Sequence, residues 1–406
     1  MARGRARTAL AIGAVSSRPA AAGTRVTAEV DGLPVWFESG DVALEAAPEA
    51  VASAFLLPAL HFGDRLTLDQ ALDPVWSANA GRLVAIFHDW WRYPRLVPEA
   101  PTASLEADGA APSSAGQSRP ANSEPGAARP AEAASRGAVA LFFSGGVDSF
   151  YSLLHGGRRP DLLVTVQGFD VALDDAPRMA AVERTLRAVG EAHGIRTAVV
   201  RTNLRDHPRV RALAWERAHG GALAAVGLLL GGEASEVWIS SSIARHRERS
   251  WGSHWRTDPL FSSSRVGIRQ IGMELRRTEK IPRIAGDPLA RRHLRVCWEN
   301  RASEGNCSRC AKCLITRLVL AGCGALEAFP VFEGKGTLAH DLDALPAYHD
   351  RLKSLTELSV NPRLDPDVRR ATVALLKRSR HAHSLPVRAR RALLGRVLRL
   401  AGARRS

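Results

Sequence analysis

The sequence predicts an α/β fold built on a doubly wound parallel sheet, flanked by a small α+β module and a helical C-terminal extension. Three observations carry this prediction. Short apolar runs alternate with helical patterns from residue 137 onward, a Gly-rich turn follows the first run, and closely spaced cysteines come near the end of the segment. Alternating buried strands and helices are typical of parallel sheets covered on both faces. We therefore expect one α/β domain over residues 137–335.

Composition and cysteine usage exclude several classes of protein. Apolar residues make up 45% and charged residues 24% of the 406 positions, which is ordinary for a globular protein and excludes fibrous or wholly disordered architectures. No apolar run reaches the roughly 18 residues that a membrane-spanning helix needs. Five cysteines are too few for a disulfide scaffold in a chain of this length. We therefore expect a soluble, cytoplasmic protein with reduced thiols.

The positive charge of the chain is concentrated at its ends. The formal net charge is +15, and residues 363–406 hold thirteen Lys and Arg against two Asp. The first nine residues add three arginines, so the body of the chain is nearly neutral. A nucleic-acid partner is therefore left open but is not favoured.

The N-terminal hundred residues are expected to contain a leader and a small module. Residues 1–24, rich in Arg and Ala, are expected to be disordered. Residues 25–100 are predicted as an α+β module with a hairpin turning at Asp31-Gly32, a helix over 48–60 and a strand over 83–87. The Trp and Phe residues of this module are expected to form a core rather than a binding surface.

A linker separates this module from the α/β domain. Ala, Pro, Ser and Gly fill 25 of the 36 positions from 101 to 136, so this segment is expected to be disordered. Beyond it, buried strands are predicted at 138–143, 162–166, 197–200 and 237–239, and helices at 176–193, 215–230 and 314–321. Residues 336–406 are predicted as a basic extension of three helices, with breaks near Pro362 and Pro386.

A Gly-rich loop follows the first predicted strand of the α/β domain. It reads Ser144-Gly145-Gly146-Val147-Asp148-Ser149 and precedes a helical pattern at 150–154. A strand, a Gly-rich turn and a helix start gather backbone N–H groups around one point, where the helix dipole favours an anion. The serines add hydroxyl donors, and Asp148 can hold a divalent cation that bridges phosphates. The pattern therefore predicts a phosphate-binding site.

This loop resembles the pyrophosphate-binding loop of the N-type ATP pyrophosphatases, the PP-loop family, which has a doubly wound, HUP-like fold. It lacks the Gly-Lys-Ser/Thr of a Walker A loop. Members of the family cleave ATP between the α and β phosphates, transfer AMP to a carbonyl or carboxyl oxygen, and let a nucleophile such as ammonia displace the AMP. The resemblance implies that the loop residues bind ATP and Mg²⁺; these are Ser144, Gly145, Gly146, Val147, Asp148 and Ser149.

Four cysteines form a second motif. Cys297 precedes Cys307, Cys310 and Cys313, and the last three are separated by two residues each. Four thiolates at these spacings in a reducing compartment fit a tetrahedral metal site. Zn²⁺ in a structural role is favoured, and an iron–sulfur cluster is the less favoured alternative. Cys323, ten residues further on, is expected to be a packed core thiol rather than a persulfide carrier.

Together, the two motifs resemble the 7-cyano-7-deazaguanine synthase branch of the PP-loop family, over roughly residues 137–330. The resemblance places a substrate loop at 251–261, in which His254 is a candidate catalytic residue and Asp258 a second titratable group. A surface histidine without a catalytic role is the alternative for His254. The substrate loop and both terminal extensions depart from that branch, which favours a different acceptor.

The same resemblance places further ATP contacts in the α/β domain. A cation that faces the phosphates is expected at Arg277 or at Lys280. Gly168 and Phe169, after the second predicted strand, are expected beside the adenine and ribose, and Phe169 as a core residue is the alternative.

These observations predict an ATP-dependent enzyme that forms C–N bonds. It would adenylate an oxygen of a small-molecule acceptor, release pyrophosphate and transfer ammonia or an amine, with ATP, Mg²⁺ and structural Zn²⁺ as cofactors. A tRNA-modifying enzyme (thiolation or lysine attachment) and a non-catalytic nucleotide-binding protein are the alternatives. The basic helix predicted at 386–401 has an apolar stripe, so packing on its own protein is favoured over RNA or membrane-surface binding.

Overall fold

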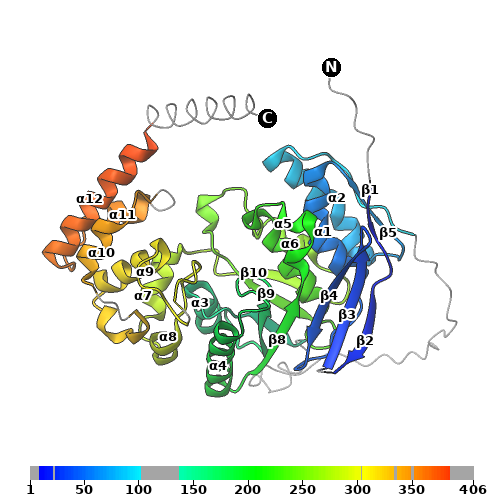
Figure 1. The fold of residues 1–406 in the computed structure, drawn as a ribbon, viewed down its shortest axis with the longest axis horizontal. Helices are drawn as coiled ribbons and strands as arrows, with labels where there is room; N and C mark the ends of the chain where they lie inside the picture. Colours follow the sequence, from blue (N-terminus) through cyan, green and yellow to red (C-terminus); the bar gives the residue numbers. More distant parts are fainter. Residues whose placement is uncertain are drawn as a thin grey trace, which may run out of the picture.

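The computed structural model describes residues 9–21, 23–101, 137–302, 304–332, 336–348 and 352–384, and its centre is one sheet (Figure 1). The strand order is β10 (Gly267–Ile271), β9 (Glu236–Ser240), β6 (Val139–Phe142), β7 (Leu162–Gln167), β8 (Arg196–Thr202), β4 (Leu33–Ser39), β3 (Gly23–Val30), β1 (Ala9–Ile12) and β5 (Arg65–Leu68), and β2 (Ser16–Ala20) pairs with β3. In Figure 1 the N-terminal strands lie at one end of the molecule and the C-terminal helices at the other.

Twelve α-helices are found among the described residues. They are α1 (Pro48–Phe62), α2 (Pro74–Trp91), α3 (Val147–His155), α4 (Ala176–His193), α5 (Pro208–Arg211), α6 (Trp215–Leu228), α7 (Arg277–Ile284), α8 (Pro288–His293), α9 (Ala311–Gly322), α10 (Leu338–Ala344), α11 (Leu352–Ser359) and α12 (Pro366–His383). In this part of the chain, no helix combines the length and apolarity that crossing a bilayer requires.

The α/β part of the sheet is parallel and doubly wound. Strands β8, β7, β6, β9 and β10 pair in parallel, and the winding direction reverses between β6 and β9. Ala140 and Phe142 of β6 enter one hydrophobic cluster and Val139 and Leu141 enter another, so both faces of this strand are buried. Burial on both faces explains the continuous apolar runs. The α/β class and the four strands predicted in this region are confirmed.

Strand β10 was not predicted, and its place in the sheet explains why. It lies at the edge and pairs with β9 alone. Arg269 in its middle is exposed and lies 3.7 Å from Glu236. An edge strand can carry charged residues because one side of it faces solvent, so the apolar run that marked the buried strands is missing here.

The N-terminal region is not separate from the α/β domain, which corrects two predictions. Residues 9–12 and 16–20, expected in a disordered leader, form β1 and β2. β4 pairs antiparallel with β8, with Phe37 opposite Thr202, so the predicted module continues the sheet. Helix α1 also packs closely on α6, where a Cβ at Gly221 would lie 2.3 Å from the Ser53 carbonyl oxygen. One hydrophobic cluster spans both regions.

Within the N-terminal region, two predicted elements are confirmed and one is wrong. The hairpin turns at Asp31 and Gly32, whose φ angles of 48° and 76° are those of a type I′ turn, and the helix predicted over 48–60 is α1. The strand predicted over 83–87 lies inside α2. Asp73 caps that helix and Pro74 occupies its first position, so the apolar residues around 83–87 follow a helical period that began at Trp76.

The C-terminal helices pack on α9. Leu314, Ile315 and Leu318 of α9 share a hydrophobic cluster with leucines of α10, α11 and α12. The buried guanidinium of Arg317 also donates to Asp341 of α10 at 2.7 Å. The break predicted near Pro362 falls between α11 and α12. The basic helix predicted at 386–401 and positions 102–136 of the predicted linker lie outside the described residues.

Candidate functional site

The Gly-rich loop connects β6 to α3 at the carboxyl edge of the parallel strands. Gly145 has a φ of +70°, which favours glycine, and Gly146 is the extended residue before the helix starts at Val147. The first helical bond runs from the Phe150 N–H to the Gly146 carbonyl. The backbone N–H groups of the first turn thus have no acceptor within the helix, which is the arrangement that binds an anion.

A cavity of about 280 Å³ opens beside this loop. It lies at the carboxyl ends of β6, β7 and β9, where the winding direction reverses and open α/β sheets bind ligands. The polar residues that line it include two groups far apart in sequence: Ser144, Asp148, Ser149 and Asp170, and then Ser240, Arg277, Thr278, Arg295, Lys312 and Thr316. The structure therefore brings the loop together with α7 and the cysteine region.

Asp148 is held by both cations predicted near the phosphates. The Arg277 guanidinium donates to Asp148 Oδ2, with an Nε distance of 2.9 Å, and Lys280 Nζ donates to Oδ1 at 3.2 Å. Burial by itself would raise the pKa of Asp148, but the two cations outweigh it and hold the pKa at about 2. Asp148 is therefore ionised near neutral pH. Arg277 also lines the cavity, whereas Lys280 lies behind it.

Lys280 is fully buried, with 0% of its surface exposed. Its ammonium donates to the Ser241 carbonyl oxygen at 2.5 Å as well as to Asp148, and it lies 5.4 Å from the centroid of the Tyr151 ring. A buried ammonium requires such partners, because an unpaired charge away from water is very costly. Lys280 thus fixes the position of Asp148 from behind, and Arg277 faces the cavity.

Gly168 and Phe169 have different places. Gly168 has a φ of +100°, and a Cβ there would lie 1.9 Å from the Thr202 carbonyl oxygen, so this glycine allows β7 and β8 to approach. It does not line the cavity. Phe169 lines the cavity wall and packs its ring 5.1 Å from that of Trp215. Its apolar neighbours on the wall include Val164, Val166 and Val171.

Arg295 and Trp298 line the cavity and were not predicted. The Arg295 N–H donates to the Gly145 carbonyl at 2.8 Å, which ties this segment to the Gly-rich loop. Its guanidinium donates to Asn300 at 2.9 Å, while its Nε is buried with no partner among the described residues. Trp298 lies at the cavity with 60% of its surface exposed. In the sequence, only their closeness to Cys297 indicated a role for these two residues. That closeness points to the cavity only once the contact between residue 295 and the Gly-rich loop is known.

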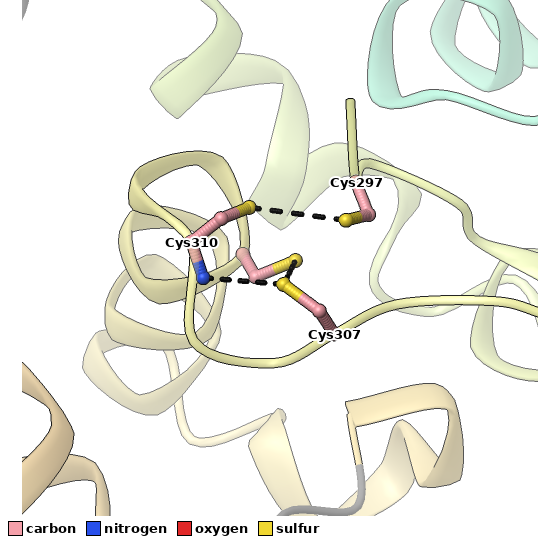
Figure 2. Close-up of side chains that lie close together, drawn as sticks. Cys297, Cys307 and Cys310 are labelled. Atoms are coloured by element: carbon pink, nitrogen blue, oxygen red, sulfur yellow. Dashed lines mark hydrogen bonds between the residues drawn. The ribbon is translucent and has the colours of Figure 1, made fainter. Parts of the chain in front are cut away.

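The four predicted cysteines come together. Their sulfurs all lie within 4.8 Å of one another, with 4.0 Å between Cys297 and Cys310 and 3.9 Å between Cys307 and Cys313. Figure 2 shows Cys297, Cys307 and Cys310 pointing toward a common centre. A tetrahedral ion with Zn–S bonds of about 2.3 Å separates its sulfurs by about 3.8 Å. The four thiols therefore fit a metal ion of this kind.

The backbone around the cysteines is held by hydrogen bonds from neighbouring side chains. Asn306 Oδ1 accepts from the Val296 and Cys297 N–H groups, and the Cys310 N–H points at Cys307 Sγ at 3.3 Å. Arg317 donates to the Ser308 carbonyl at 2.8 Å, which links the cysteine loop to α9. Cys297 itself lines the cavity. The cysteine group thus forms part of the wall of the candidate site.

Cys323 lies apart from this centre. Its thiol donates to the Leu320 carbonyl at 3.3 Å, and burial raises its pKa. It does not line the cavity, and its sulfur does not belong to the group of four. This is the packed thiol that the sequence favoured.

His254 does not lie at the cavity, so the structure does not bring it to the other candidate residues. It is 1% exposed and packs edge-on against Trp90 of α2. Its Nδ1 accepts from the Arg256 N–H at 3.1 Å, and burial lowers its pKa to about 4. The predicted substrate loop folds against the N-terminal region. The sequence around residue 254 contains no pattern that predicts this contact. His254 is also not the surface histidine of the alternative reading.

Asp258, in the same loop, is fully buried and accepts four hydrogen bonds. The donors are the Ser253 hydroxyl at 2.6 Å, the His254 N–H at 2.9 Å, Gln270 at 3.1 Å and the Thr257 hydroxyl at 3.4 Å. Burial raises its pKa to about 7 despite these donors. This network holds the loop in place.

The two groups should give the loop opposite pH dependences. His254 adds stability that is present above pH 6.5 and is lost as the pH falls through about 4. Asp258 adds stability that is present near pH 4 and is lost as the pH rises through about 7. In Asp258→Asn the His254 effect remains alone, so we expect the free energy of unfolding to fall by up to about 3 kcal/mol more than in the wild type between pH 6.5 and 4. Urea unfolding at several pH values measures the free energy of unfolding of each variant. In His254→Gln this free energy should instead rise as the pH falls from 6.5 to 4. If the free energies of the wild type and the two variants change with pH in parallel, this explanation is contradicted.

Comparisons with known proteins add no assignment. A scan against protein-family models found no match, and searches of curated proteins and of solved structures returned no significant similarity. The functional argument therefore depends on the geometry of the site.

Proposed function

We propose that this protein is an ATP-dependent enzyme of the PP-loop ATP pyrophosphatase type. The observation that supports it best is the Gly-rich loop at the start of α3, placed beside the Asp148–Arg277–Lys280 cluster at the cavity. Backbone N–H groups, the Ser144 hydroxyl and Arg277 converge there on one region. Such a concentration of donors and positive charge suits the β and γ phosphates of ATP.

The rest of the cavity suits the remainder of the nucleotide. Arg295 and Lys312 add positive charge on the side of the metal centre, where they would neutralise charge that develops at the α phosphate. Phe169 and Val171 offer an apolar wall for the adenine. Asp148 is the carboxylate that would hold Mg²⁺, which would neutralise phosphate charge when bound. Arg277 can exchange its bond to Asp148 for one to a phosphate oxygen.

The proposed reaction has two steps. An oxygen of the acceptor attacks the α phosphorus, the bond to the bridging oxygen breaks, and pyrophosphate leaves on the Gly-rich loop. Ammonia or an amine then attacks the activated carbon, AMP departs with the acceptor oxygen, and the nitrogen loses a proton. The acceptor is a small molecule with a carboxyl or carbonyl group, and one round of these steps turns a carboxyl group into an amide. A nitrile forms when a second ATP adenylates the amide oxygen and AMP then leaves with that oxygen as the nitrogen loses its protons. Positioning and charge neutralisation supply most of the catalysis.

The four cysteines would hold structural Zn²⁺ in this scheme. All four positions of a tetrahedral ion are taken by sulfur, so no position is left for substrate. Four thiolates at this site require reducing conditions, which is why we propose a cytoplasmic enzyme.

The products of ATP cleavage test the proposal. The full chain is incubated with Mg²⁺, ¹⁵N-ammonium, α-³²P-labelled ATP and a cell extract as the source of acceptors. We expect labelled AMP, pyrophosphate and a new ¹⁵N-containing product in mass spectra. Formation of ADP and orthophosphate as the primary products would contradict cleavage between the α and β phosphates, and failure to bind ATP would contradict the nucleotide site.

A further inference from the structure

A surface of paired arginines and tryptophans lies next to the candidate site. It is built from the end of α2, the turn after β8, the start of α6 and the loop after β9, and we call it the Arg–Trp surface. Its members are Trp90, Trp91, Arg205, Trp215, Arg217, Arg245, Arg249, Trp251, Trp255 and Arg256. Contacts between a cation and an aromatic ring occur roughly once per 70–80 residues, and five of them gather here.

Each of the five tryptophans has a guanidinium over its ring. The distances from guanidinium carbon to ring centroid are 4.3 Å for Arg249 on Trp251, 4.4 Å for Arg245 on Trp255 and 4.5 Å for Arg205 on Trp215. The other two pairs, Arg217 on Trp91 and Arg256 on Trp90, are at 5.4 Å and 5.9 Å. All five tryptophans are partly exposed, and the arginines apart from Arg217 are exposed. The surface therefore presents flat, charged and aromatic groups to solvent.

Contacts between elements make this one surface. Trp251 lies 5.9 Å from the His219 ring of α6, and the Gly252 N–H donates to the Glu216 carbonyl at 2.8 Å. His254 of the same loop packs on Trp90 of α2 at 4.9 Å. The loop therefore bridges the two helices and brings their tryptophans to its own.

The charge on this surface is strongly positive. Residues 245–256 hold four arginines and a single acidic residue, Glu248, which pairs with Arg256 at 3.0 Å. Among the described residues, Arg245 and Arg249 form no ion pair. Their guanidinium edges can therefore take up an anion, while the rings beside them offer stacking faces.

The Arg–Trp surface adjoins the cavity through Phe169. This residue lines the cavity and also contacts Trp215, and its carbonyl accepts from Arg205 at 2.5 Å. A long ligand on the surface would therefore lie close to the cavity wall at Phe169. Stacking groups interleaved with cations that can neutralise phosphates, contributed by several segments of the chain, suit a chain of bases and phosphates.

We infer that the Arg–Trp surface binds single-stranded nucleic acid. Arginines contact its phosphates, and exposed tryptophan and guanidinium faces stack with its bases. An acidic protein segment would use the charge of this surface but would leave the stacking faces without planar partners. The inference stands apart from the proposed function, because the arginines that it invokes do not line the cavity.

Fluorescence anisotropy with a 20-nucleotide, mixed-sequence, 5′-labelled single-stranded RNA tests the inference. The full chain is titrated without ATP at several salt concentrations. We expect the affinity to fall steeply with salt, and an abasic strand of equal length to bind at least ten-fold more weakly, because it lacks the bases that would stack on the tryptophan and guanidinium faces. In Arg245→Gln/Arg249→Gln we expect at least a ten-fold weaker affinity. The slope of log affinity against log salt should also be smaller by about 1.4, since each contact contributes about 0.7.

A matched control removes two exposed arginines elsewhere. Arg187→Gln/Arg196→Gln carries the same change in charge on α4 and β8, where both arginines pair with glutamates. This control should bind RNA as the wild type does. Equal losses in the two variants, equal affinity for the abasic strand, or preference for an acidic peptide would overturn the inference. ATP cleavage by Arg245→Gln/Arg249→Gln is measured separately and should be unchanged, so failure of either proposal can be told from failure of the other.

Discussion

Asp148→Asn is expected to abolish ATP cleavage and to weaken the fold at the same time. The change removes the carboxylate that would hold Mg²⁺, and it leaves the buried ammonium of Lys280 without its anionic partner. Since the pKa of Asp148 is about 2 rather than 3.8, the ionised carboxylate contributes about 2 kcal/mol to the free energy of unfolding near neutral pH. ATP cleavage is measured by pyrophosphate release and stability by urea unfolding.

The pH dependence separates this effect from a general loss of packing. The contribution of Asp148 is present above pH 4 and is lost as the pH falls from about 4 through 2. The stability difference between wild type and Asp148→Asn should therefore shrink across this window. Asp206→Asn is the control, because Asp206 is exposed in a loose pair with Arg211 at 3.8 Å, where little stability is expected. A difference that stays constant down to pH 2.5 would contradict the ion-pair explanation.

Cys310→Ser is expected to release the metal and to destabilise the α/β domain. Structural Zn²⁺ in small proteins contributes about 10–16 kcal/mol of binding free energy that couples to folding, so losing one ligand should lower the melting temperature by many degrees. The cavity should suffer as well, because Cys297, Trp298 and Lys312 line it. Elemental analysis should find one metal ion per wild-type chain and substantially less in the variant. Equilibrium dialysis should show weaker nucleotide binding.

Cys323→Ser provides the matched control for this change. Cys323 is partly buried and its sulfur lies outside the group of four. We expect this variant to keep its metal and to lose little stability. An unchanged melting temperature of the wild type after complete chelation would show that the four cysteines do not support the fold through a metal.

The features that the sequence predicted well are local in the chain. The strands β6, β7 and β9 are buried on both faces, and β8 buries Ala198 and Val200 on one face with Val199 half-buried on the other, so each contains an apolar run. The cysteine group is recognisable because three of its members lie within seven residues and share one loop and helix start. The Gly-rich loop is likewise contiguous, and its place between β6 and α3 follows from the pattern around it.

The features that were missed depend on contacts between distant segments. His254 has a titratable side chain in a polar loop, yet the loop packs on Trp90, more than 160 positions earlier, and is directed away from the cavity. Arg295 enters the site because its N–H meets the Gly145 carbonyl. The strand predicted at 83–87 is wrong for a local reason, because Asp73 and Pro74 start a helix that continues through these residues.

The pairing of β4 with β8 has a consequence for how the chain acquires its fold. Phe37 meets Thr202 only after more than 160 residues have been made, so the N-terminal strands emerge from the ribosome long before their partner. Contacts between residues so distant in sequence form slowly, because the entropy cost of closing a long loop comes before the contacts can stabilise the chain. During that interval the edge of β4 is unpaired and the apolar side chains of α1 are exposed, because β8 and α6 have not yet been made. Such a state is prone to aggregation. Strand β4 and helix α1 therefore need protection during synthesis until β8 and α6 have been made.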